Sequence, residues 1–311
     1  MKRFTVVILL LQLLLAAFLI SGCTENPKKG NPHTGRTKVY TSIHPIYYLA
    51  SEIAGDHADI VEILPPSSDP HTYEPSPKEI VDLQSSDLFI YNGAGLEPWA
   101  EKVAGSLGEN VSVLQIAEVV YDQLPQGNDP GYPVDTADPH FWLDPVMAKN
   151  MAEAIAETLI KVDKKNKDSY GENFTSLALR LDGLHRDYDE TLRKCEGKEF
   201  VVTHGAFGYL AARYDLKQIS IMGMGEESEP NPAYLGELIK LLKTHGIGYI
   251  FSEPLSSIKV TKTLADETQS EILFLNPIGT LTKEQESRGE NYMTLMYDNL
   301  EQLKIALGQN E

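Results

Sequence analysis

The chain has 311 residues, and 45 Asp and Glu against 27 Lys and Arg give it a formal net charge of −18 at pH 7. Such an acidic chain is a poor partner for nucleic acid or for anionic lipid surfaces, because both carry negative charge themselves. The length suits one large domain or two medium ones.

The first 36 residues predict an export signal and a tether. Two basic residues precede an apolar run, Phe4–Ile20, and small residues stand directly before Cys23. This order is typical of a signal peptide, and a cysteine at this point matches the bacterial lipobox, in which the thiol is lipidated. We expect a signal peptide over residues 1–22, a lipid anchor on Cys23 and a flexible tether over residues 23–36. The alternatives are a plain signal peptide that ends near a cysteine, or a retained membrane helix, for which the run is short.

The expected processing also fixes the compartment and the role of the cysteines. Removal of residues 1–22 would change the formal charge from −18 to −20, because Lys2 and Arg3 are lost. The mature protein is expected outside the cytoplasm, anchored to the bacterial cell membrane. With Cys23 lipidated, Cys195 is alone, which excludes an internal disulfide and a metal site built from thiolates.

After the tether, strand-like and helix-like segments alternate in two runs. The first run has expected strands at residues 38–43, 60–64, 88–91 and 111–116, with helices at 45–53, 77–84 and 99–107. The second has strands at 200–203, 218–221, 249–251 and 272–275, with helices at 207–214, 233–244, 258–268 and 292–306. This alternation predicts an α/β protein of two lobes with mostly parallel sheets.

Between the two runs, the sequence predicts one long helix. Residues 161–193 contain no proline, and apolar residues recur there at spacings of four, three, four, three and four, at Tyr170, Phe174, Leu177, Leu181, Leu184 and Tyr188. That spacing is typical of an amphipathic helix. We interpret it as a rigid linking helix, residues 166–194, between an N-terminal lobe, 37–165, and a C-terminal lobe, 195–311. The alternative is a pair of surface helices broken at Gly171.

Three of the eight histidines are candidate metal ligands. His71 and His140 each stand in an Asp-Pro-His sequence, and His204 ends an apolar strand. In open α/β folds, ligands bind beyond the carboxyl ends of strands, and three neutral imidazoles suit Zn²⁺. Each histidine taken alone could instead cap a helix or fill a gap. His44, beside Pro45 at the same expected sheet edge, could be a further ligand or a partner of one.

Around these histidines the sequence resembles the zinc- and manganese-binding receptors of bacterial metal ABC importers. The resemblance is carried by residues 64–77, 138–145, 202–209, 229–232, 252–254 and 275–280. It implies two α/β lobes joined by one long rigid helix, with the metal bound in the cleft between the lobes. It also implies delivery of the metal to a membrane permease, with the first three ligand positions on His71, His140 and His204. We expect a monomer.

Two features depart from the pattern of this family. Many relatives carry Asp or Glu where Gly279 stands, so the fourth ligand is left open between water and a neighbouring carboxylate. The segment before His140, residues 121–138, has aspartates but no histidine, whereas many zinc receptors have a histidine-rich loop there.

Manganese-type relatives tend to carry Glu at the position of His204, and a nitrogen ligand there favours zinc.

Other functions stay possible at this point. A manganese receptor of the same family would share most of the ligands. A zinc hydrolase would also use three histidines and an open fourth position; Glu253 and Glu227 could be its base by type, but no HExxH motif supports them. An adhesin is a third possibility, although the sequence has no repeats. We expect a receptor without enzymatic activity.

Overall fold

The first lobe is built on a parallel sheet with an apolar centre. The computed structural model describes residues 35–120, 138–222 and 231–308. Four strands pair in the order β2-β1-β3-β4: β1 (Thr37–Thr41), β2 (Ala58–Glu62), β3 (Leu88–Tyr91) and β4 (Ser112–Gln115). All four residues of β3 are buried, as expected for a strand covered on both faces. The connecting helices are α2 (His44–Ala54), α3 (Pro77–Leu83) and α4 (Pro98–Ala104).

Proline marks where each of these helices begins. All three have Pro at the first or second helical position, where its missing N–H group costs nothing and its fixed φ favours the helix. In α3, Ser76 and Glu79 complete a capping box, which satisfies two backbone N–H groups of the first turn.

The second lobe repeats the strand order of the first. Its strands are β5 (Glu199–Val202), β6 (Lys217–Ser220), β7 (Tyr249–Ser252) and β8 (Glu271–Phe274), all parallel in the order β6-β5-β7-β8. Its helices are α8 (Gly208–Arg213), α9 (Pro232–His245) and α10 (Lys259–Thr268). In each sheet the strand order reverses beside the lobe's first strand, and such a switch point opens a crevice at the carboxyl ends of the strands.

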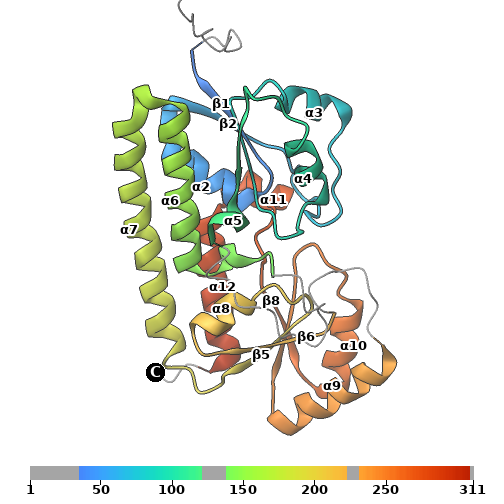
Figure 1. The fold of residues 1–311 in the computed structure, drawn as a ribbon. Coiled ribbons are helices and arrows are strands. Elements are labelled where there is room, and N and C mark those ends of the chain that lie inside the picture. The colour runs from blue at the N-terminus through green and yellow to red at the C-terminus, as the bar shows by residue number, and fades with distance from the viewer. Residues whose placement is uncertain (1–34, 121–137, 223–230, 309–311) are drawn as a thin grey trace, which may run out of the picture. The chain divides into compact units, whose positions relative to one another are not determined.

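A long helix accompanies both sheets, as the sequence predicts (Figure 1). Helix α7 (Lys167–Leu192) has 26 residues, or roughly 39 Å at 1.5 Å per residue. It continues through Gly171 without a break, so it is one helix and not two. Of the predicted apolar stripe, Phe174 is partly buried and the other five residues are fully buried.

Helix α7 does not stand alone. Helix α6 (Pro145–Val162) runs beside it, connected through the short 3₁₀ turn Lys164–Asn166 (Figure 1). Helices α5 (Ile116–Val120) and α12 (Tyr292–Leu307) complete this helical layer, and α2, α6, α7 and α12 share one hydrophobic core. Within the described ranges, no helix combines the length and apolar character that a membrane span requires.

The segment after β8 is bound to the first lobe. The N–H of His44 donates to the oxygen of Gly279 at 3.2 Å, and the N–H of Ser67 donates to the oxygen of Leu281 at 2.8 Å. The short helix α11 (Lys283–Ser287) follows, between a predicted strand at 272–275 and a predicted helix at 292–306, and was not among the predicted elements. Its signal was a capping box between Thr282 and Gln285.

Candidate metal centre

The two Asp-Pro-His sequences adopt the same local structure. In each, the Asp carboxylate accepts the backbone N–H of the histidine two residues later, at 2.9 Å from Asp69 to His71 and 2.9 Å from Asp138 to His140. This is an Asx turn, in which a short side chain replaces a backbone acceptor. Because the residue between them is proline, whose φ is fixed, each histidine leaves its turn in a restricted direction.

His140 has a second bond to the same carboxylate. Its Nδ1 lies 2.8 Å from Oδ1 of Asp138, and its side chain is 2% exposed. A carboxylate partner on Nδ1 requires the proton there, which leaves a lone pair on Nε2, directed at Nε2 of His71. The backbone before it is held too, because the side-chain amide of Asn92, just after β3, donates to the oxygen of Pro139 at 3.0 Å.

His204 comes from the switch point of the second sheet. It follows β5, and Glu253 follows the neighbouring strand β7. Oε1 of Glu253 lies 3.2 Å from Nδ1 of His204, and both residues are buried. Two of the three histidines therefore have a carboxylate near Nδ1: Asp138 is hydrogen-bonded to His140, and Glu253 lies within ion-pair distance of His204. Carboxylates in these positions orient imidazole ligands in metal sites.

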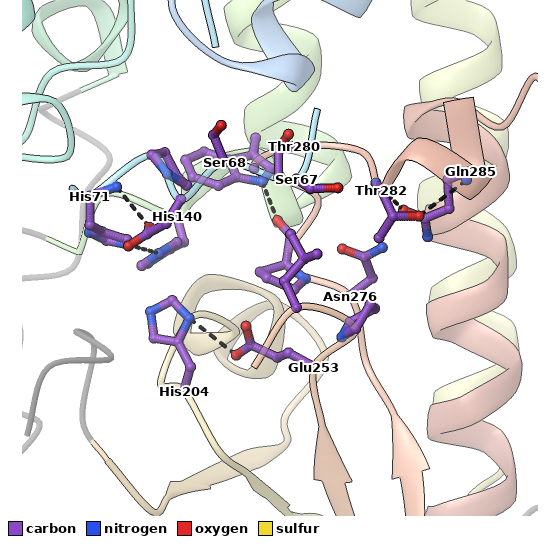
Figure 2. A pocket seen from close by; sticks show the side chains of 17 residues that line it. Ser67, Ser68, His71, His140, His204, Glu253, Asn276, Thr280, Thr282 and Gln285 are labelled. Carbon is purple, nitrogen blue, oxygen red and sulfur yellow. Dashed lines mark hydrogen bonds and ion pairs between the residues drawn. The ribbon is translucent and has the colours of Figure 1, made fainter. Parts of the chain in front are cut away.

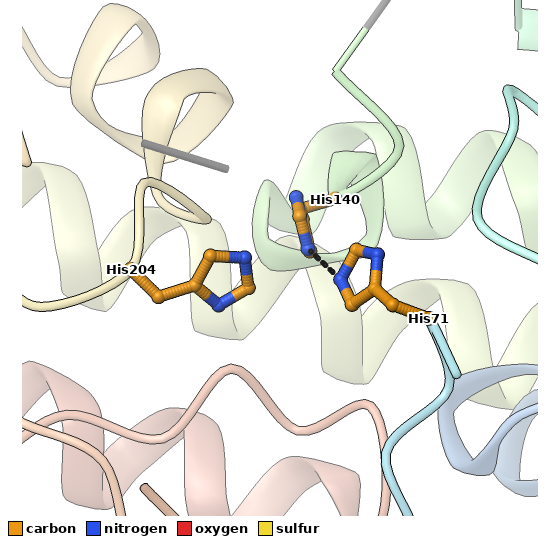
Figure 3. A group of neighbouring side chains, drawn as sticks. All are labelled: His71, His140 and His204. Carbon is orange, nitrogen blue, oxygen red and sulfur yellow. Dashed lines mark hydrogen bonds between the residues drawn. The ribbon is translucent and has the colours of Figure 1, made fainter. Parts of the chain in front are cut away.

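The three imidazoles converge (Figure 3). One nitrogen of each of His71, His140 and His204 lies within 4.8 Å of the others. The Nε2 atoms of His71 and His140 are 3.3 Å apart. A tetrahedral zinc ion with Zn–N bonds of 2.0–2.1 Å holds two nitrogens about 3.3–3.4 Å apart. The geometry of this pair therefore already fits zinc.

The environment keeps two of these three imidazoles, His71 and His140, neutral. Burial lowers the pKa of His71 to about 4, and the neighbouring His204 adds to the effect. Burial likewise holds the pKa of His140 well below its usual value, helped by His204 and His71. Only the neutral imidazole can donate its lone pair to a metal, so at neutral pH both rings are ready to bind one.

A cavity of about 140 Å³ adjoins the three histidines (Figure 2). Trp142, Glu253, Gly279 and Thr280 help to line it. A Cβ at Gly279 would lie 3.1 Å from Cγ of Pro70, so even a small side chain at this position would press on the turn that carries His71. Among the described residues, the cluster of metal-ligating side chains consists of the three histidines alone.

The other residues that the sequence singled out either lie away from the three histidines or are not among the described residues. His44 is buried, but its Nδ1 faces Glu62 at 3.2 Å and the residue lines a different cavity, of about 650 Å³. It does not join the cluster. Cys23, Glu227 and residues 121–137 lie outside the described residues. The orienting carboxylate of Asp138 was not among the predicted site residues. The signal for it was an aspartate two residues before His140.

Two parallel α/β lobes with a long helix, and imidazoles from both lobes within contact distance, define a class: the two-lobed metal receptors. Residues 39–306 match the family model described as zinc-uptake complex component A, periplasmic. The chain belongs to this family.

Individual relatives agree with the family match. The chain is 34% identical to the high-affinity zinc uptake system protein ZnuA of Bacillus subtilis over 300 residues, 93% of this chain and 94% of that protein. It is 33% identical over 309 residues to the zinc-binding lipoprotein AdcA of Streptococcus pneumoniae, covering 97% of this chain but only 61% of AdcA.

Solved structures share the fold. The Zn(II)-bound ZnuA-like domain of the same AdcA superposes with a TM-score of 0.76 at 33% identity, over 88% of this chain and all of that domain. The laminin-binding protein of Streptococcus agalactiae, described as having adhesin and metal-transporting activity, superposes with a TM-score of 0.77 at 30% identity. That match covers 87% of this chain and 99% of the other.

Proposed function

We propose that this chain is an extracytoplasmic zinc receptor that binds one Zn²⁺ through His71, His140 and His204 and delivers it to the permease of an ABC importer. The observation that carries the proposal is the convergence of three imidazoles, two from the first lobe and one from the second, within 4.8 Å. Because the three ligands come from both lobes, a bound metal ion would hold the two lobes in one position relative to each other.

The donor set favours zinc over manganese. Imidazole nitrogen suits zinc, whereas manganese prefers carboxylate, carbonyl and water oxygen. The carboxylates of Asp138 and Glu253 face the Nδ1 atoms of their histidines, so they orient the ligands from behind. Relatives that carry zinc in their names support the same choice.

The same geometry supports a receptor better than a hydrolase. A hydrolase needs a carboxylate free to take a proton from the metal-bound water. Glu253, the candidate base in the described site, lies 3.2 Å from Nδ1 of His204 and points toward that ring (Figure 2). Its position suits the orientation of a ligand.

Anchoring completes the proposal. The lipobox-like sequence before Cys23 supports cleavage after residue 22 and attachment of the receptor to the outer face of the cell membrane through lipid. A Cys23→Ala variant should then be released into the medium or periplasm, and unchanged membrane retention would contradict the anchor.

The binding test uses the metal-free protein without its signal peptide. Titration calorimetry with zinc should show one tight site per chain, with manganese weaker. His71→Ala, His140→Ala and His204→Ala should each weaken zinc binding by orders of magnitude, because each removes one of three protein ligands. His245→Ala is the matched control, since this histidine is exposed and its Nδ1 lies 2.5 Å from Glu199. Two tight zinc sites, wild-type affinity in His204→Ala, or tighter binding of manganese would overturn the assignment.

A further inference from the structure

Trp142 connects one metal-binding histidine to the segment that follows β8. The centroid of its ring lies 5.3 Å from the centroid of His140. Its Nε1–H donates a 2.8 Å hydrogen bond to the backbone oxygen of Pro277. The residue is 1% exposed, so water does not compete for this N–H group and the bond is retained.

The groups that Trp142 contacts are themselves held in place. Its backbone oxygen accepts a 2.6 Å hydrogen bond from the hydroxyl of Tyr292, the first residue of α12. Asn276, one residue before Pro277, exchanges two hydrogen bonds with Asn299 of α12, at 2.8 and 2.7 Å. Helix α12 therefore holds the backbone of Trp142 and the segment that accepts its hydrogen bond, and the indole cannot turn away from His140 without breaking the bond to Pro277.

The indole also fills the space beside the cavity. A Cβ at Gly279 would lie 3.9 Å from Cζ2 of Trp142, which is ordinary van der Waals contact. His140 is thus limited in two directions, by the carboxylate of Asp138 at Nδ1 and by the indole near its ring. Its Nε2 is left facing His71 and the cavity.

We propose that Trp142 is a positioning residue that couples zinc binding at His140 to the segment Asn276–Thr280. This inference rests on the proposed zinc site. In the free protein, the indole holds His140 in the orientation that zinc requires. In the bound protein, the hydrogen bond from Trp142 to Pro277 connects the zinc ligand His140 to the segment between the lobes, so it slows the dissociation of zinc.

The chain offers a matched pair of variants, because Trp99 is its only other tryptophan. Trp142→Phe keeps an aromatic ring beside His140 but leaves the oxygen of Pro277 without this donor. Trp99→Phe changes a tryptophan that is also buried, at 4% exposure, in a separate core cluster of the first lobe. Zinc dissociation into excess chelator, followed by stopped flow, should be roughly tenfold faster in Trp142→Phe and unchanged in Trp99→Phe.

Fluorescence shows whether the surroundings of Trp142 change when zinc binds. In Trp99→Phe the remaining tryptophan is Trp142, and its emission should change when zinc binds. In Trp142→Phe the remaining tryptophan is Trp99, and its emission should stay constant. Equal dissociation rates in the two variants, or a silent Trp142 at saturating zinc, would overturn the inference. If Trp142→Phe does not fold, the emission of Trp99→Phe decides alone. Failure of the wild type to bind zinc would overturn the proposed function itself.

Discussion

Gly208, at the start of α8, lies against the carboxylate that orients His140. A Cβ at position 208 would stand 2.9 Å from Oδ2 of Asp138, closer than such atoms approach in folded proteins. The other oxygen of this carboxylate accepts both the backbone N–H and the Nδ1–H of His140. The second lobe therefore needs glycine here so that a histidine of the first lobe can keep its orientation.

Gly208→Ala should weaken zinc binding at least tenfold, because it displaces a group that orients a ligand. Gly236→Ala, in α9, is the control, since a Cβ there would meet no atom within 4 Å. Competition against a chromophoric zinc chelator measures both affinities. Equal affinities in the two variants would show that Asp138 can move without consequence for the site.

The two Asp-Pro-His turns should respond differently to the loss of charge. Asp138→Asn weakens the carboxylate contact with the ring of His140, so we expect zinc affinity to fall about 10- to 100-fold. Asp69→Asn changes a side chain that accepts only from the backbone of His71 and the hydroxyl of Thr72, and a neutral amide oxygen can still accept there. Its zinc affinity should stay within a few-fold of wild type. The reverse order in the same chelator assay would contradict this division of roles.

Glu97 should give the metal-free protein a pH-dependent stability. Burial raises its pKa to about 7, although Ser42 and the N–H groups of Asn92 and Gly93 donate hydrogen bonds to it. Between pH 4.5 and 7 the folded state then holds more protons than the unfolded state, so the free energy of unfolding falls as pH rises, by roughly 3 kcal/mol from this group.

Urea unfolding at pH 5 and pH 7.5 tests this contribution. The lowered pKa values of His71 and His140 act in the opposite direction over this range, so the comparison is between variants. Relative to wild type, Glu97→Gln should shift the change in the free energy of unfolding between pH 5 and pH 7.5 toward higher stability at pH 7.5, because an amide does not titrate. Glu101→Gln, on the exposed side of α4, should keep the wild-type dependence. A wild-type dependence in Glu97→Gln would contradict the assignment of the effect to this carboxyl.

Removal of zinc should lower the melting temperature. Zinc binds the folded state, and free zinc at 1,000 times the dissociation constant stabilises that state by about 4 kcal/mol, or on the order of 10 °C for a chain of this size. Differential scanning calorimetry with zinc and with a chelator should show this shift in wild type and in His245→Ala. His204→Ala should melt at the same temperature under both conditions.

Gly171→Ala should stabilise the protein. Gly171 lies inside α7, and a Cβ there would meet nothing within 4 Å. Alanine in a helix interior is favoured over glycine by about 0.5–1 kcal/mol. Urea unfolding should show a gain of this size with zinc affinity unchanged; a loss of stability would mean that the helix is not continuous at this point.

The fold could be predicted largely because apolar runs and periodicity are local signals. Residues 88–91 were predicted as a strand with the bounds of β3, and α7 begins and ends within two residues of its predicted bounds. Helix α11 was missed because its five residues carry no apolar stripe, only a capping box.

The site was harder to predict, because its geometry depends on which strands become neighbours. Glu253 is far from His204 in sequence, and only the pairing of β5 with β7 brings the two together. His44 was one possible further ligand or partner of a ligand, because it follows β1 at the carboxyl edge of the sheet. It instead faces Glu62, at the end of the adjacent strand β2, a pairing that periodicity does not reveal.

The path of the chain after β8 links the unfolding of one lobe to that of the other. Having left the second sheet, the chain bonds to the first lobe through Gly279 and Leu281, and then returns along α12 to Leu307, whose oxygen accepts the N–H of Gly197 beside β5. Neither lobe is therefore formed by one continuous stretch of sequence, because each contacts chain segments that belong to the other half of the sequence. A cut at the end of α7 would leave each fragment without part of its packing, so we expect the two lobes to melt as a single cooperative unit.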